Sequence, residues 1–195
     1  MKKKVLKLPE GHGWRCQPGH KIFVADRGAV RFDYPESWVI TPSETSIKFH
    51  NKKPPDDDCV LEVTVFQLSP QIDWSALPLA SLLRQATAGE DGPAPDGPVV
   101  EDIRDDLELV WTEQRSMDPE LDREAVHRTC LARTRNTRAV SSQGVVYSVR
   151  PDVQALMTLA FWPEDQSWVD PAWQEVLRSL QLGIMVRDPF NRNPQ

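Results

Sequence analysis

The sequence has few cysteines and no long apolar run, and each shortage excludes a class of protein. Its 195 residues include three cysteines, Cys16, Cys59 and Cys130, which are too few and too scattered for a disulfide framework. No apolar stretch approaches the roughly 18 residues of a membrane-spanning helix. Residues 2–4 are lysines, as in a signal peptide, but the polar residues 8–13 follow in place of an apolar region. We therefore expect a cytoplasmic protein without a membrane partner.

An excess of positive charge and the common catalytic motifs are missing as well. The chain carries 23 Lys and Arg against 29 Asp and Glu, a formal net charge of −6, and this balance disfavours bulk attraction to nucleic acid. The glycine-rich phosphate loop, the dinucleotide fingerprint and the G-x-S-x-G nucleophile turn do not occur. The sequence therefore predicts a protein that is not an enzyme and has no nucleic-acid partner.

Hydrophobic patterns predict a sheet with two helices. Alternation and β-branched content indicate strands over residues 22–25, 29–34, 46–50, 59–68, 107–115, 126–134, 145–150 and 153–161. The spacing of Leu79, Leu82, Leu83 and Ala86 indicates the first helix. Short turns join most of the strands, so the predicted fold class is α+β, a mainly antiparallel sheet with helices packed on it.

The second strand predicts which of its side chains are buried. Val30, Phe32 and Tyr34 alternate with Arg31 and Asp33. Because successive side chains of a strand point to opposite faces, the three apolar residues should face the core and the two charged residues should face water.

The sequence also predicts the position of the most apolar strands in the sheet and the ends of the last helix. Residues 59–68 and 153–161 are apolar on both faces, as in central strands that are covered on each side. The last helix should begin with Asp170 as its N-cap and Pro171 at its first position. Gly183 should end that helix in the left-handed conformation.

The chain is expected to form one domain with irregular ends. Residues 1–21 contain no clear periodic pattern and form the expected N-terminal arm, while residues 184–195 form a C-terminal tail. The domain itself would cover residues 22–183. Residues 89–98 are rich in glycine, proline and acidic side chains, and we interpret them as a surface loop because each flank alone is too small for a complete core.

A family resemblance supports this fold. Two places in the sequence carry it. One is the motif F-x-Y-P-x-x-W at residues 32–38, and the other is the terminal helix of residues 173–182, which follows an apolar strand. At these two places the sequence resembles the PsbP-like (Mog-type) α/β/α sandwich family. The resemblance extends over residues 22–183 and implies a sheet between helical layers. It also implies a protein partner, because the family includes photosystem-associated subunits, a Ran-binding nuclear import factor and bacterial chaperones of secreted effectors. It carries no catalytic residue over to this sequence.

The best candidate for a metal site consists of His12, Cys16 and His20. Two imidazoles and a thiolate suit zinc, with His50 or a carboxylate as the fourth ligand. The spacing matches no common zinc module, and the intervening glycines and proline prevent one helix from presenting all three side chains. We interpret the segment as an arm without metal and expect no cofactor, with zinc as the alternative.

A cysteine nucleophile and a calcium loop are not expected. His127 and Cys130 are an odd number of residues apart in one strand, so their side chains should point to opposite faces, whereas an activated thiol needs its base nearby. We interpret Cys130 and Cys59 as small core residues. Residues 56–58 are three aspartates without the alternating spacing of a calcium loop, which indicates a solvated turn.

An arginine-rich segment follows an acidic one, and two interpretations stay open. The arginines are Arg123, Arg128, Arg133, Arg135 and Arg138, and the acids are Glu101, Asp102, Asp105, Asp106, Glu108 and Glu113. Guanidinium groups suit phosphate and carboxylate ligands, which would make the cluster a partner-binding patch. Adjacent strands can instead pair the opposite charges on a solvent face, at roughly 0.2–1 kcal/mol for each pair, and we favour this interpretation.

Seven tryptophans are many for a chain of this length. Three occupy core-like positions, Trp38, Trp111 and Trp173, and four lie near the ends of elements, Trp14, Trp74, Trp162 and Trp168. Rings at element ends can lie half exposed. Core packing explains all seven, but two or more on one surface would make an interaction hot spot.

Together these observations favour a non-catalytic protein-interaction module, an adaptor or chaperone-like protein whose partner is another protein. The alternative is a small-molecule-binding protein or an enzyme with a pocket assembled from distant residues, such as His127 or the arginines. A deep apolar cavity with converging polar groups would favour the alternative. The sequence identifies no catalytic, cofactor-binding or metal-ligating residue.

Overall fold

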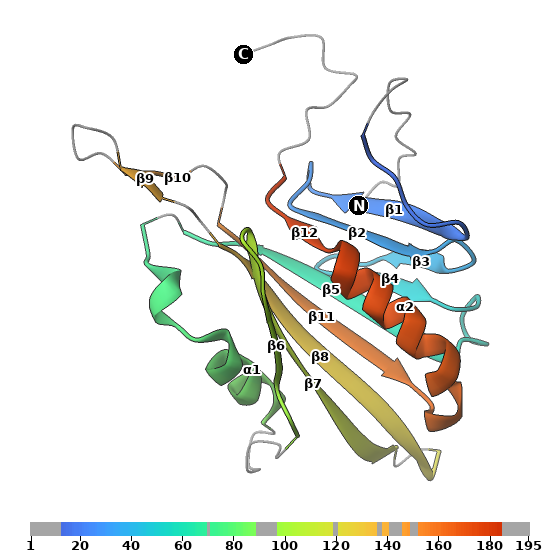
Figure 1. Cartoon of the computed structure of the whole chain (residues 1–195). Helices are drawn as coiled ribbons and strands as arrows, with labels where there is room; N and C mark the ends of the chain where they lie inside the picture. The colour runs from blue at the N-terminus through green and yellow to red at the C-terminus, as the bar shows by residue number, and fades with distance from the viewer. Residues whose placement is uncertain are drawn as a thin grey trace.

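A seven-stranded sheet forms the middle layer of the protein and carries one helix on each face (Figure 1). The structure is a computed structural model that describes residues 13–69, 71–88, 97–118, 121–135, 138–140, 146–148 and 152–184. In order across the sheet, the strands are β3 (Val39–Pro42), β4 (Ile47–His50), β5 (Cys59–Gln67), β11 (Val153–Phe161), β8 (Arg123–Thr134), β7 (Leu107–Asp118) and β6 (Val100–Ile103). Every neighbouring pair is antiparallel, which confirms the predicted fold class.

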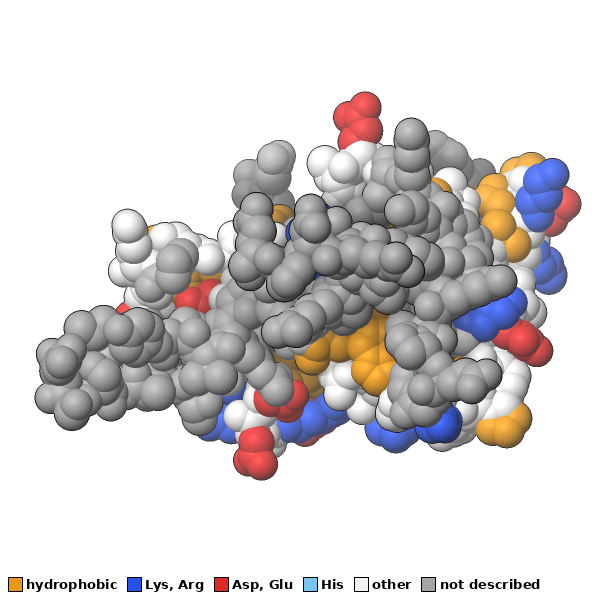
Figure 2. All heavy atoms as spheres, turned by 90° about the horizontal axis from the view of Figure 1, so that it is seen from above, with side chains coloured by type: hydrophobic (Ala, Val, Ile, Leu, Met, Phe, Trp, Pro, Cys, Tyr) orange, Lys and Arg blue, Asp and Glu red, His pale blue; other side chains and the backbone are white. Residues whose placement is uncertain are grey.

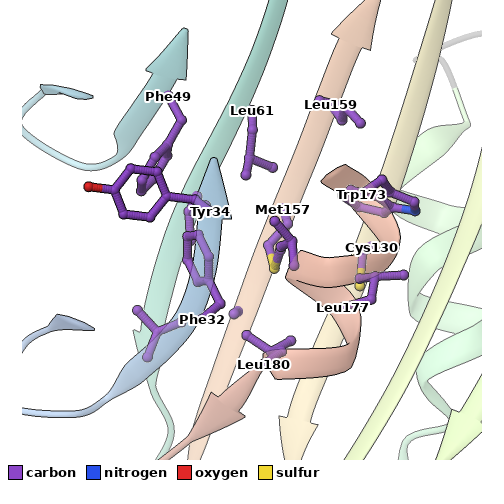
Figure 3. Close-up of a cluster of buried hydrophobic side chains, with 14 of the residues drawn as sticks. Phe32, Tyr34, Phe49, Leu61, Cys130, Met157, Leu159, Trp173, Leu177 and Leu180 are labelled. Atoms are coloured by element: carbon purple, nitrogen blue, oxygen red, sulfur yellow. The ribbon is translucent and has the colours of Figure 1, made fainter. Parts of the chain in front are cut away.

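One face of this sheet is covered by the last helix and a small second sheet. The helix α2 (Gln166–Ser179) follows the 3-10 turn η2 (Pro163–Asp165), and the small sheet has the order β1 (His20–Ala25), β2 (Val30–Pro35), β12 (Gln181–Leu182). Phe32 and Phe49 place their ring centroids 5.3 Å apart between the two sheets. Trp173 of α2 lies over β11 and β8, and its ring centroid is 6.0 Å from that of Trp111. Figure 3 shows this core.

The other face carries a shorter helix. The helix α1 (Leu79–Thr87), after the 3-10 turn η1 (Trp74–Ala76), packs on β7 and β8. Leu79 and Leu83 are fully buried there against Val110 and Leu131. Two further strands, β9 (Arg138–Val140) and β10 (Val146–Ser148), pair only with each other. No helix in the described part of the chain is long and apolar enough to cross a membrane.

The prediction that both central strands are buried on each face is wrong. Along β5 and β11, fully buried residues alternate with half-buried or exposed ones. The buried set faces α2. The other set faces the side of α1, but that helix packs mainly on β7 and β8 and reaches β11 through Leu156, so no helix of the described residues covers the rest of β5 and β11 on this side. Apolar content on both faces therefore does not report a second covering layer here.

The prediction that Arg31 and Asp33 face water is also wrong. Arg31 is 7% exposed and Asp33 is 1% exposed. Their face of β2 lies against the end of α2, where Arg31 Nη1 donates to Ser179 O at 2.9 Å and Asp33 N donates to Ser179 Oγ at 2.8 Å. Trp14 of the N-terminal arm lies over the guanidinium of Arg31, with 6.0 Å from the ring centroid to Cζ. A second covering layer thus buries the charged face, and the charges are paired across 2.7 Å.

The predicted start and end of the last helix are corrected as well. The helix begins at Gln166 after Asp165 as its N-cap, so Asp170 and Pro171 both lie inside it. The carboxylate of Asp170 accepts instead from Arg128 Nη2 at 2.6 Å. Gly183 does adopt a left-handed conformation, with φ of 64°, but it lies after β12 and the helix has ended at Ser179.

The remaining differences concern short strands and the ends of the chain. Sequence patterns missed β3, β6, β9 and β12, each of four residues or fewer. His20 and Lys21 belong to β1 rather than to an irregular arm. Residues 1–12, most of the loop at 89–98 and residues 185–195 lie outside the described residues, so the proposed domain limits stay a prediction.

Candidate interaction surface

The part of the sheet that no described helix covers is the main candidate surface, and we call it the open face. It consists of the side chains on β5 and β11 that point to the side of α1, namely Val60, Glu62, Thr64, Phe66, Leu156, Thr158 and Ala160. The antiparallel register places Glu62 opposite Thr158 and Thr64 opposite Leu156. Because directly opposite residues share one face of a sheet, these side chains form a continuous strip.

The open face has an apolar end and a polar middle. Phe66 is 42% exposed at the apolar end, diagonal to Leu156, which packs against the small core beneath α1. Ile72 and Leu77, in the segment that leads into α1, are exposed large apolar side chains as well. The middle is polar because Glu62 lies beside Lys48, with 3.6 Å between carboxylate oxygen and ammonium nitrogen.

Arg133 fixes the segment that borders the open face. Its Nη1 donates to Trp74 O at 2.6 Å and its Nη2 donates to Leu77 O at 3.0 Å. The same guanidinium pairs with Glu108, which lies directly opposite on β7, at 3.2 Å. Arg133 is almost fully buried, so this arginine holds the layer of α1 onto the sheet and is not presented to a partner.

Arg128 holds the helix α2 onto the opposite face of the sheet. Its Nε donates to Glu113 at 2.8 Å, and its Nη2 donates to Asp170 of α2 at 2.6 Å. The guanidinium lies over two rings, with Cζ 5.7 Å from the centroid of Trp111 and 5.0 Å from that of Phe161. Glu113 is its direct cross-strand partner.

The arginine cluster is therefore mainly a set of structural charge pairs. Cross-strand pairing is confirmed for Arg128 and Arg133, but the predicted solvent face is wrong, since both are buried. Arg123 contacts Glu164 and stacks on Trp162, with Cζ 4.1 Å from the ring centroid. Of the remaining two, Arg135 donates to Arg104 O at 2.8 Å, and the side chain of Arg138 lies outside the described residues.

Neither buried cysteine is placed for nucleophilic catalysis. Cys130 points into the core below α2, whereas His127 is exposed on the opposite face, as the spacing predicted. Burial raises the pKa of the Cys130 thiol to about 12 and that of the Cys59 thiol to about 12. Both thiols therefore stay protonated near neutral pH, and the protonated thiol is not the nucleophile.

The described part of the zinc candidate makes local contacts only. Cys16 Sγ donates to His20 O at 3.2 Å, and His20 Nδ1 lies 3.3 Å from Pro18 O. His12 lies outside the described residues. Within the described ranges, no three His, Cys, Asp or Glu side chains gather closely enough to hold a metal ion.

The aspartates of residues 56–58 take part in a turn that is tied down by neighbouring side chains. Asp57 accepts from the ring of His50 at 2.8 Å, and Asp58 contacts Lys52 at 2.5 Å. Asn51 Oδ1 accepts from the backbone N–H groups of Asp58 and Cys59. These partners are protein groups, as in a closed turn.

A shallow polar hollow lies beside the C-terminal end of α1. It has a volume of about 470 Å³ and is lined by Thr87, Gly97, Glu113, Gln114, Arg115, Ser116 and His127. Of these residues, sequence reasoning singled out His127 as a pocket candidate and Glu113 only as part of the acidic block. The others come from α1, from the approach to β6 and from β7, so only the folded chain brings them together.

The tryptophans follow the expected division between core and margin. Trp38 and Trp173 are buried and Trp111 packs against the core, whereas Trp14, Trp74 and Trp162 are half-buried and Trp168 is exposed. Trp168 belongs to α2 and Trp74 to the layer of α1, so they lie on opposite sides of the main sheet. In the view from above Figure 1, hydrophobic side chains gather at the centre, with both signs of charge around them (Figure 2).

Comparisons with known proteins identify relatives and a shared fold. The sequence model of the Alr1449 family matches residues 21–186. The uncharacterized protein alr1449 of Nostoc sp. (strain PCC 7120) is 39% identical over 189 residues, which cover 96% of this chain and 90% of that protein.

Among solved structures, the cyanobacterial PsbP protein CyanoP of Synechocystis sp. PCC 6803 aligns with a TM-score of 0.52 at 10% identity, over 87% of this chain and 98% of its own. The Ran-binding protein Mog1p of Saccharomyces cerevisiae aligns with a TM-score of 0.41 at 12% identity, over 84% of this chain and 95% of its own. The likeness to CyanoP confirms the PsbP-like fold.

Proposed function

Because the chain belongs to the Alr1449 family and has a PsbP-like fold, we propose that it is a non-catalytic protein-interaction module that binds its partner through the open face. The observation that carries the proposal is the face of β5 and β11 that no helix in the described part of the chain covers. Its apolar end contains Phe66 at 42% exposure. Exposed aromatic side chains within an apolar patch are common anchors of protein interfaces.

The chemistry of the remaining groups supports a non-catalytic role. The two most conspicuous arginines, Arg128 and Arg133, are consumed by contacts that hold helices onto the sheet. The thiols of Cys59 and Cys130 are buried and protonated near neutral pH. The hollow near α1 is shallow and polar, unlike the deep apolar pockets that enclose small ligands.

An adaptor or chaperone-like role and a cytoplasmic location belong to the same proposal. Cys16, Cys59 and Cys130 are all free thiols, which suits a compartment in which thiols stay reduced. Fractionation of cells that express the tagged chain tests the location, and recovery in a membrane or exported fraction would contradict it.

The function is tested with two variants, each of which replaces one exposed aromatic side chain by glutamate, on opposite sides of the main sheet. Phe66→Glu places a charge on the open face, and Trp168→Glu places one at an equally accessible aromatic position on the opposite layer, where Trp168 is 38% exposed. Each tagged chain is used to capture proteins from the native cell lysate, and the eluates are compared by quantitative mass spectrometry.

We expect one protein partner to be retained by the parent chain and by Trp168→Glu, and to be lost from Phe66→Glu. Thermal unfolding of all three chains controls for folding. Equal retention by both variants would place the partner elsewhere than on the open face. If native mass spectrometry finds no protein but a small molecule of fixed mass, the chain is a small-molecule binder and the proposal is wrong.

A further inference from the structure

Two tryptophans flank an aspartate where β11 leads into α2. Trp162 follows β11, Asp165 ends η2, and Trp168 lies in the first turn of α2. These residues follow one another at intervals of three, and residues three apart lie on the same side of a 3-10 or α-helical turn. The structure describes every residue from 152 to 184, so this part of the chain is continuous. We call Trp162, Asp165 and Trp168 the tryptophan ridge.

One end of the tryptophan ridge already binds a cation of the same chain. The guanidinium of Arg123 lies over Trp162, with Cζ 4.1 Å from the ring centroid, and it also contacts the carboxylate of Glu164. A guanidinium is attracted by the electrons of an indole face, and a neighbouring carboxylate accepts from its N–H groups. A tryptophan beside a carboxylate therefore binds an arginine side chain at this end of the molecule.

The other end of the ridge has the same two chemical groups. Trp168 Nε1 donates to Asp165 Oδ1 at 3.0 Å, so the carboxylate is held at the edge of the ring. Trp168 is 38% exposed. Among the described residues, no Arg or Lys lies over the ring of Trp168, and no ion pair includes Asp165.

Asp165 can accept further hydrogen bonds because it does not cap the helix that it precedes. An aspartate in this position commonly accepts from the first free backbone N–H groups of the helix, but Asp165 makes no side-chain capping bond. Its carboxylate accepts from the indole of Trp168, and a carboxylate has about four acceptor positions. Its remaining positions can therefore accept from N–H groups of a ligand.

The surroundings of the ridge are acidic. The loop between β4 and β5 lies at the same end of the large sheet as the start of α2 (Figure 1). A hydrogen bond to Asp58 raises the pKa of Lys52 in this loop, and Asp165 adds to the increase, so the loop lies near the ridge. Residues 51–58 and 162–168 carry five carboxylates, whereas the cations at this end are Lys52, Lys53 and Arg123. Two of these cations are already bound, Lys52 to Asp58 and Arg123 to Glu164. This charge favours a cationic ligand over an anionic one.

We propose that Trp168 and Asp165 bind an arginine side chain of a partner protein, with the guanidinium over the indole ring and an N–H group donating to the carboxylate. Arginine suits the site better than lysine, because a planar guanidinium can stack on a ring and still direct its N–H groups at a carboxylate. A quaternary ammonium suits it less well, because such ligands are bound by cages of several rings, and Trp162 is already covered by Arg123. The ridge adds a second binding site to the proposed interaction module, on the other side of the large sheet from the open face.

The test titrates the full chain with the peptide acetyl-Gly-Arg-Gly-amide and follows the indole N–H signal of Trp168 by NMR. The same peptide with citrulline in place of arginine is the matched control, because citrulline keeps the shape of the side chain and has no positive charge. The Trp168 signal is identified by its absence from the spectrum of Trp168→Phe. Trp173, which is 1% exposed, gives the internal reference.

We expect the arginine peptide to shift the Trp168 signal to saturation and the citrulline peptide to leave it unchanged. Trp168→Leu, which keeps an apolar side chain without a ring, and Asp165→Asn should each weaken binding by about two- to fivefold, the effect of one exposed cation–π contact or ion pair. Trp168→Phe keeps a ring and should bind more tightly than Trp168→Leu. Binding to these variants is followed at the backbone amides of Ser167 and Val169, and thermal unfolding shows that each variant folds.

Three results would overturn the proposal. They are no saturable shift with the arginine peptide, an equal shift with the citrulline peptide, and unchanged affinity in both Trp168→Leu and Asp165→Asn. Choline is titrated in parallel, and tighter binding of choline than of the arginine peptide would assign the site to a quaternary ammonium ligand and overturn the proposal as well.

A failure at the ridge can be told apart from a failure of the proposed function. In the lysate capture, Phe66→Glu alters only the open face and Trp168→Glu alters only the ridge, so each variant reports on one site. If Phe66→Glu retains every captured protein while the arginine peptide binds as expected, the open face is not the binding site and the proposal for the ridge stands. If the peptide does not bind while Phe66→Glu loses its partner, only the proposal for the ridge is wrong.

Discussion

Replacing the buried Arg128 by alanine should destabilise the fold far more than the same replacement of the exposed Arg123. Arg128 is 4% exposed and joins three elements, because it bonds to Glu113 of β7 and Asp170 of α2 from its place on β8. Truncation leaves both carboxylates without their cation and opens a gap between Trp111 and Phe161. We expect α2 to lose the polar bond that joins its middle to the large sheet.

The magnitude follows from the two bonds and their surroundings. A hydrogen bond between charged groups contributes about 1.5–3 kcal/mol, and removing one partner of a buried ion pair costs about 3–5 kcal/mol. The side chains of Glu113 and Asp170 are partly exposed, at 28% and 43%, so they return to water and the lower end applies. A loss of about 3 kcal/mol lowers the melting temperature of a chain this size by about 6–12 °C.

Urea unfolding followed by circular dichroism measures this loss, with Arg123→Ala as the control. Arg123 is 42% exposed where it contacts Glu164, and an exposed pair contributes about 0–1 kcal/mol. Arg128→Lys should recover only part of the stability, because an ammonium cannot bridge two carboxylates while stacking on a ring. If Arg128→Ala unfolds at the same urea concentration as Arg123→Ala, the structural role argued for Arg128 is refuted.

Two further predictions concern buried titratable groups. In the native chain, a thiol reagent at neutral pH should label Cys16 and spare Cys59 and Cys130, whose pKa burial raises to about 12; rapid labelling of all three without denaturant would contradict this. Burial raises the pKa of Asp33, an effect that Arg31 partly offsets, so the native state holds this proton more tightly than the unfolded state does. Its contribution to stability should therefore fall as pH rises from the ordinary value of 3.8 through the raised value. Urea unfolding of the parent chain and Asp33→Asn across this range should show the parent losing stability relative to the variant, and the opposite slope would refute the argument.

The sequence predicted the elements that are long enough for a regular apolar spacing to be seen. It missed the strands that are too short for one. The strands β5, β8 and β11 and both helices were recognised from apolar spacing, and all of them exist. The strands β6 and β12 have four and two residues, too few for an alternation to be counted. Their place is set by the neighbours that they pair with, which is tertiary information.

Predictions from neighbouring residues were wrong where a side chain distant in the sequence bonds the residue in question. Asp170 and Pro171 match the start of a helix, yet the helix begins five residues before Pro171, and the carboxylate of Asp170 bonds Arg128 on β8. Likewise, Arg31 and Asp33 match the exposed face of an alternating strand, but Ser179 at the end of α2 accepts from the arginine and buries the pair. No window of sequence around either site contains the competing residue.

The open face has its origin in the length of a covering element. α1 has nine residues and packs on β7 and β8, while β5 and β11 lie farther across the sheet. A longer helix in this place would bury Phe66 without any change to the sheet itself. The cover of this face is therefore set by a peripheral element, which explains why apolar patterns in the strands predict the fold and do not predict which of their side chains stay exposed.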